Sequence, residues 1–144
     1  MDKEDIKKDI KHRALAGVAG STLGYIGGAA YGVAGTQAKY LKDRRKYVKN
    51  KAKGKHIDKN MKKKMIQRFD NEIVPVKRIF PDLNSKKIRP RKEIYRARMG
   101  MEGARLGVTG LVKGMPYGIV AYSLYDGNKN RMKKIMKGDS NNGN

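Results

Sequence analysis

Two stretches of this chain alternate apolar residues with glycine, and a polar, strongly basic region separates them. Residues 14–38 form a run of 25 residues with no charged side chain. Such a run is long enough to cross a hydrocarbon layer of roughly 30 Å as a helix. The second stretch, 104–125, contains Arg105, Lys113 and Pro116. We expect it to form a less regular helix that is kinked at the proline.

Both stretches carry the same spacing of glycines, at a fixed offset of 83 residues. Intervals of three and four residues place such glycines along one side of a helix. Glycine costs a helix in water about 1 kcal/mol relative to alanine, whereas in lipid it allows close helix contact. We therefore predict helix-packing seams, either within one chain or between copies, at Gly17, Gly20, Gly24, Gly27, Gly100, Gly103, Gly107, Gly110 and Gly114.

The region between the two stretches changes character along its length. Residues 39–68 contain 14 Lys or Arg against only Asp43 and Asp58. Residues 73–83 include Pro75 and Pro81, which exclude a long helix and favour an extended segment or a short edge strand. Pro90 suits the start of the second helix, and Asp126-Gly127 is expected to end it.

These patterns predict an all-α fold with two long Gly-rich helices, arranged as a transmembrane hairpin and joined by a basic, partly extended linker. The expected segments are an N-terminal helix with the first glycine repeat (1–38), the basic connecting region (39–89), the second glycine-repeat helix (90–127) and a basic, Asn-rich tail (128–144).

Charge adds the expectation of a polyanionic partner. The chain has 35 Lys or Arg and 13 Asp or Glu, a net charge of +22. Such an excess favours nucleic acid, an anionic lipid surface or an acidic assembly. The residues expected to bind this anion are Lys42, Arg44, Arg45, Lys46, Lys49, Lys51, Lys53, Lys55, Lys62, Lys63, Lys64 and Arg68.

The sequence offers no catalytic constellation. It has no cysteine, and its two histidines, His12 and His56, lie among basic residues without an evident nucleophile or orienting acid. The acids are scattered singly, which does not suit a carboxylate metal site. We therefore expect a protein that is not an enzyme and has no metal or cofactor.

The doubled pattern, Gly17/Gly20/Gly24/Gly27 and Gly100/Gly103/Gly107/Gly110/Gly114, resembles that of glycine-zipper membrane proteins, although those often repeat glycine every fourth residue. Small, very basic, Gly- and Ala-rich chains with one or two apolar spans also look like minor structural proteins of bacteriophage virions. These include membrane-associated and DNA-ejection proteins. This resemblance implies a basic part that meets the genome or lipid headgroups, and an apolar part in a membrane.

The resulting expectation is a membrane-embedded structural protein, in a virion membrane or a host cell membrane and in multiple copies. Its basic middle region would link the lipid bilayer to capsid or other virion proteins, or to genomic nucleic acid. The alternative is a soluble nucleic-acid-binding or internal virion assembly or ejection protein, whose glycine helices pack against protein. A third option is a pore-forming, holin-like protein, in which so long a basic region is unusual.

Overall fold

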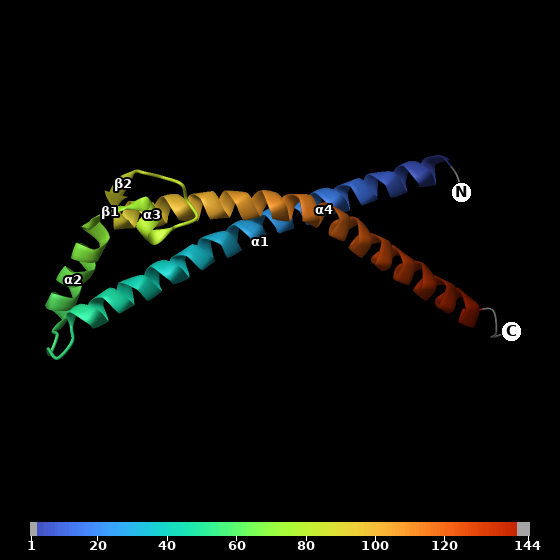
Figure 1. The fold of residues 1–144 in the computed structure, drawn as a ribbon. Coiled ribbons are helices and arrows are strands. Elements are labelled where there is room, and N and C mark those ends of the chain that lie inside the picture. Colours follow the sequence, from blue (N-terminus) through green and yellow to red (C-terminus); the bar gives the residue numbers. More distant parts are fainter. Residues whose placement is uncertain (1–2, 141–144) are drawn as a thin grey trace. The chain divides into compact units, whose positions relative to one another are not determined.

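The computed structural model describes residues 3–140, and these residues are mostly helical. Two long helices, α1 (Lys3–Lys51) and α4 (Arg91–Ser140), pack as a hairpin. The middle segment contains α2 (Lys59–Asn71), β1 (Ile73–Pro75), α3 (Val76–Ile79) and β2 (Ile88–Pro90) (Figure 1). The expectation of two long Gly-rich helices is therefore confirmed. The expected helix end at Asp126-Gly127 is wrong, because α4 continues through it, and Pro116 also lies inside α4.

The chain divides into two compact units, and both long helices contribute to each of them. Unit 1 combines Met1–Ala29 with Leu106–Asn144, and unit 2 consists of Ala30–Arg105. The N-terminal part of α1 thus belongs with the C-terminal part of α4. The remaining parts of the two helices belong with the middle segment.

In unit 1 the backbones of α1 and α4 meet at glycines. A Cβ atom on Gly24 would overlap the carbonyl oxygen of Gly110, and a Cβ atom on Gly110 would overlap that of Gly24. Gly20 and Gly114 repeat this reciprocal arrangement one turn along. Only hydrogen fits at these four positions, so the close approach of the helices requires glycine there.

The carbonyl contacts recur every four residues along both helices. Gly118 lies against the Ala16 carbonyl, and Gly28 lies against the Leu106 carbonyl. Within unit 2, Gly32 continues the series against the Glu102 carbonyl. The contact row on α1, which we call the glycine seam, therefore follows a four-residue repeat at Gly20, Gly24, Gly28 and Gly32.

The other glycines of the sequence pattern occupy different places. A Cβ atom added to Gly17 would lie 3.4 Å from the side chains of Met115 and Ile119. A Cβ atom added to Gly107 would meet the Tyr25 ring. Gly103 is buried, with its backbone nitrogen 2.9 Å from the Cβ position of Gly32. Gly27 and Gly100 have nothing within 4 Å of their Cβ positions, so they lie off the helix contact.

Because glycine fills the contact, unit 1 exposes its larger apolar side chains. On α1, Leu15, Val18, Leu23 and Ile26 are 57–72% exposed. On α4, the exposed apolar side chains include Val108, Val112, Val120 and Leu124. We call this surface the outer apolar face. Lys113 is its only Lys, Arg, Asp or Glu within 14–29 and 106–125.

No helix within residues 3–140 is both long and apolar enough to cross a membrane. The spans expected over 14–38 and 104–125 are thus not found. Composition explains the difference, because seven glycines and four polar residues dilute the apolar residues of 14–38. In 104–125, Arg105 and Lys113 have the same effect.

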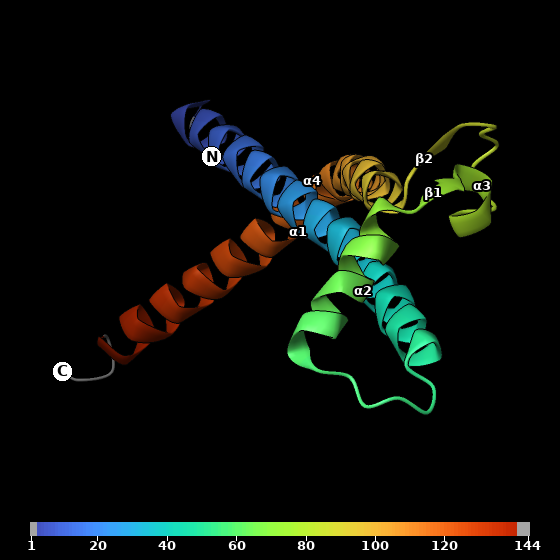
Figure 2. The same ribbon diagram turned by 90° about the vertical axis from the view of Figure 1, so that its left-hand side faces the viewer.

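Unit 2 has a conventional side-chain core. Its buried residues come from α1, α2, β1, α3 and α4, together with the residue after α3, and are Tyr40, Phe69, Val74, Ile79, Phe80, Ile94 and Tyr95. The extended segment expected over 73–83 is confirmed only at β1, which pairs antiparallel with β2 in the register Val74↔Arg89. The expectation is wrong for Val76–Ile79, which form the short helix α3 between the two prolines. Figure 2 shows α2 beside the C-terminal part of α1, and the rings of Phe69 and Tyr47 are 5.3 Å apart there.

The glycine seam predicts opposite effects for two neighbouring substitutions. Gly24→Ala should lower the free energy of unfolding by about 1–3 kcal/mol, because its methyl group collides with backbone. Gly27→Ala should raise it by up to about 1 kcal/mol, because alanine favours a helix and the site is open. Thermal unfolding followed by circular dichroism measures both. Equal destabilisation by the two variants would contradict the observed seam.

Candidate anion-binding site

The acids within the basic region are engaged by groups other than its lysines and arginines. The Tyr40 hydroxyl donates a hydrogen bond of 2.6 Å to Asp70, and the Tyr95 hydroxyl donates one to Asp43. Asp58 caps α2 by accepting a hydrogen bond from the backbone nitrogen of Met61. These carboxylates therefore stabilise the fold by hydrogen bonds to uncharged groups.

The remaining four acids of unit 2 pair with arginines of β2 and α4. The pairs are Glu72–Arg91 (2.5 Å), Asp82–Arg98 (2.6 Å), Glu93–Arg89 (3.7 Å) and Glu102 with both Arg98 (2.6 Å) and Arg105 (2.9 Å). Within residues 3–140, none of the twelve cations expected to bind an anion forms an ion pair. The positive charge of these twelve side chains is therefore not compensated by direct ion pairs within the described residues.

Four of these cations line one groove between α1 and α2. Arg44, Arg45 and Lys49 come from α1, and Lys62 comes from α2. Val48 and Ile66 complete the lining of this groove of about 420 Å³. We call it the basic groove. Arg44 is partly held by the Tyr40 ring, whose centroid lies 5.2 Å from its guanidinium carbon. Such a cluster suits phosphate or carboxylate groups.

The other predicted anion-binding residues lie exposed outside the groove, along α1, the following turn and α2. They are Lys42, Lys46, Lys51, Lys53, Lys55, Lys63, Lys64 and Arg68. The basic run thus forms a broad cationic surface, and the basic groove gathers four of its cations around a concave site.

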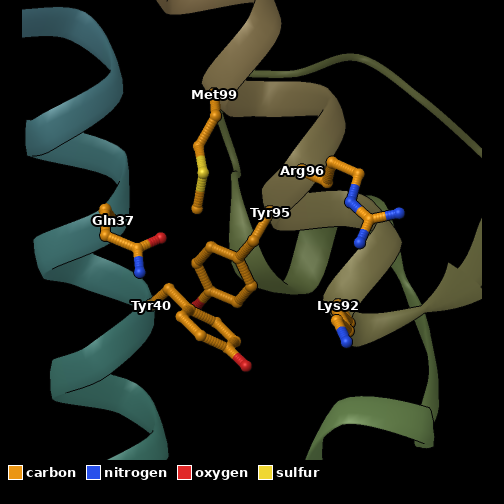
Figure 3. A pocket seen from close by; sticks show the side chains of 6 residues that line it. All are labelled: Gln37, Tyr40, Lys92, Tyr95, Arg96 and Met99. Atoms are coloured by element: carbon orange, nitrogen blue, oxygen red, sulfur yellow. The ribbon is translucent and has the colours of Figure 1, made fainter. Parts of the chain in front are cut away.

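Unit 2 also contains a second pocket, of about 220 Å³, which the sequence did not predict. Gln37 and Tyr40 line it from α1, and Lys92, Tyr95, Arg96 and Met99 line it from α4 (Figure 3). The rings of Tyr40 and Tyr95 meet edge to face, with centroids 5.2 Å apart. A signal for it was present in the four-residue spacing of Lys92 and Arg96 around Tyr95.

Burial raises the pKa of Tyr95 well above its ordinary value of 10.0, and the hydrogen bond to Asp43 raises it further. The pKa of Tyr40 is raised for the same reasons, with Asp70 as its partner. Both hydroxyls therefore keep their protons, so they can donate to the two carboxylates.

Neither histidine is placed in a catalytic arrangement. In unit 1, Nδ1 of His12 is hydrogen-bonded to the Tyr122 hydroxyl at 3.0 Å. In unit 2, His56 is exposed in the turn before α2. Among the residues that the structure describes, no three His, Cys, Asp or Glu side chains are grouped so that they could hold a metal ion.

Comparison of the chain with protein-family models, with curated proteins and with solved structures finds no match.

The tyrosine–carboxylate pairs predict a loss of stability in alkali. The unfolded chain releases tyrosine protons near pH 10, whereas the folded state holds them to higher pH. The contribution of these tyrosines to the free energy of unfolding is therefore complete below about pH 10 and is lost as the pH rises further. Tyr95→Phe should reduce this loss, and Tyr31→Phe, at an exposed position of the same unit, should not. Denaturant midpoints measured across this pH range test the expectation, which fails if the two variants respond alike.

Removing the basic groove should weaken binding to phosphate polymers. For a short DNA duplex, replacing Arg45, Lys49 and Lys62 with Gln should reduce the slope of log affinity against log salt by about 0.9 for each DNA phosphate that is no longer neutralised. The matched control replaces Lys77, Arg78 and Lys86, which are exposed elsewhere in unit 2, and removes the same charge. Fluorescence anisotropy at several salt concentrations measures both. Equal weakening by the two variants would mean that net charge matters and the groove does not.

Proposed function

We propose that this protein is a non-enzymatic structural protein of a viral particle. Its unit 1 is held in a lipid bilayer, and its basic middle region contacts the capsid shell or the genome. The observation that carries this proposal is the placement of glycine inside unit 1 and of the larger apolar side chains outside it.

The outer apolar face supports a lipid environment for unit 1. Soluble proteins seldom expose many large apolar side chains close together unless something covers them. In lipid, helices instead associate through small residues, because the apolar driving force between larger side chains is absent. The paired helices would offer Leu, Val and Ile to lipid while their glycines remain in contact with each other.

The unpaired cations of unit 2 support an anionic partner beside that layer. Basic residues follow the uncharged run of α1 immediately, beginning at Lys39, and cations at the ends of apolar segments suit a membrane surface. Capsid protein, genomic nucleic acid and lipid headgroups all offer the necessary negative charge. The viral setting comes from the resemblance of the chain to minor structural proteins of bacteriophages, and such a role implies several copies in each particle.

The basic groove itself favours a second candidate function. A protein inside a virion could bind nucleic acid through the groove, while neighbouring proteins cover the outer apolar face. The glycine seam suits this alternative as well, because it is completed within one chain and needs no second copy.

Extraction of particles or membranes that contain the full chain separates the two candidates. About 1 M salt screens charges beyond roughly 3 Å, and it should leave the protein in the pellet if unit 1 lies in lipid. Detergent should then release it. Release by salt alone would overturn the membrane proposal and favour the internal nucleic-acid-binding protein.

Two substitutions on the outer apolar face sharpen this test. Val112→Lys should weaken retention, since a central lysine costs about 2.5–3.5 kcal/mol on insertion scales. Lys113→Leu should strengthen retention by removing the charge already present. Retention that is the same in both variants would indicate that lipid does not contact this face.

A further inference from the structure

The second pocket of unit 2 begins where the uncharged run of α1 ends. Gln37 lies in the last turn of that run, and Tyr40 follows the first cation, Lys39. Under the proposed function, unit 1 lies in lipid and its part of α1 ends at Ala29, so Gln37 and Tyr40, which follow on the same helix, come at the level of the lipid headgroups. Tyrosine and basic residues are enriched at that level in membrane proteins.

The aromatic wall of the pocket is fixed in place before any ligand binds. The hydroxyls of Tyr40 and Tyr95 are held by Asp70 and Asp43, and both side chains are buried. Met99 adds an apolar surface above the Tyr95 ring (Figure 3). A preformed pocket with apolar walls and a few polar groups is typical of small-ligand sites.

The polar groups around this wall are donors without partners. Within the described part of the chain, Lys92 and Arg96 form no ion pair, and Gln37 makes no hydrogen bond. Glu93, which lies between the two cations in sequence, pairs instead with Arg89 at 3.7 Å. Lys92 and Arg96 are one helical turn apart, so both can approach one ligand. In Figure 3 the Gln37 amide reaches toward α4, whereas the Arg96 guanidinium points away from Gln37. Because the Arg96 side chain is exposed and borders the pocket, it is able to turn toward a ligand at the α4 edge of the pocket.

We propose that this pocket binds a phosphate group, and that its source is the headgroup of an anionic phospholipid. Lys92 and Arg96 supply the positive charge at the edge of the pocket on α4. The tyrosine rings and Met99 contact the glycerol portion. The choice of lipid as the source rests on the proposed function, whereas the affinity for phosphate does not.

Native mass spectrometry of the full chain in detergent tests this site, with phosphatidylglycerol or phosphatidylcholine added as the probe. The wild-type chain should retain phosphatidylglycerol in preference to phosphatidylcholine. The double variant Lys92→Gln/Arg96→Gln should lose about tenfold of that preference, as expected when charged hydrogen bonds are removed. The control, Lys77→Gln/Arg78→Gln, removes the same charge from exposed positions of unit 2 and should behave as wild type.

Soluble sn-glycerol 3-phosphate distinguishes the two sources of phosphate. If millimolar glycerol phosphate fails to displace phosphatidylglycerol, the site requires the whole lipid, as proposed. If it displaces the lipid from wild type and not from the double variant, the phosphate site stands and the lipid assignment is overturned. Lack of lipid preference in wild type, or an equal reduction in the control, overturns the site.

The same variants keep this inference separate from the proposed function. A double variant that still needs detergent for extraction but no longer retains phosphatidylglycerol supports both. A wild-type chain that salt releases from membranes overturns the membrane function and leaves phosphate binding to be decided by glycerol phosphate. Unchanged thermal unfolding of the double variant, expected because both side chains are exposed, excludes misfolding as the cause.

Discussion

Backbone contact between α1 and α4 is the constraint on which unit 1 depends. At Gly24 and Gly110 each glycine occupies the space that a side chain on the other would need. In this geometry the Cα hydrogens of the glycines point at carbonyl oxygens, an arrangement that allows weak Cα–H···O contacts. The helices approach so closely that little volume remains between them for larger side chains. Many of the larger apolar residues of both helices therefore face outward, among them Leu23 on α1 and Val112 on α4.

In unit 2 the two long helices are joined mainly by side chains and not by glycine backbone contacts. Its core consists of aromatic and aliphatic side chains, and cations close its edges. Arg91 lies 4.4 Å from the centroid of the Phe69 ring, and Lys39 lies at the same distance from Phe80. Lys39 also donates a hydrogen bond of 2.9 Å to the Ile79 carbonyl. A few cations therefore stabilise the fold, while those of the basic groove remain unpaired.

The distribution of acids links this fold to the proposed function. Seven acids in unit 2 could neutralise part of the basic run, yet tyrosines, a helix N-terminus and the arginines of β2 and α4 engage all of them. The acids keep their negative charge, but within the described residues they form no ion pairs with the cations of the basic groove. An external anion stabilises such a surface by relieving its self-repulsion. The chain thus exposes large apolar side chains in unit 1 and unpaired cations in unit 2, and the proposed function assigns a different partner to each.

The sequence by itself determined the two long helices and the basic run, because each depends on local spacing or charge. Of the extended segment expected over 73–83 it determined only the part at Ile73–Pro75, since Val76–Ile79 form a short helix. It could not select the contact row. From Gly24, Gly27 lies about 60° to one side around the helix and Gly28 about 40° to the other, since each residue turns roughly 100°. The position of α4 determines that Gly28, and not Gly27, contacts the other helix. For the same reason Gly27 and Gly100 lie outside the contact between α1 and α4. Tertiary structure also decided which acids meet tyrosines and which cations border a pocket, because those contacts join residues far apart in the chain.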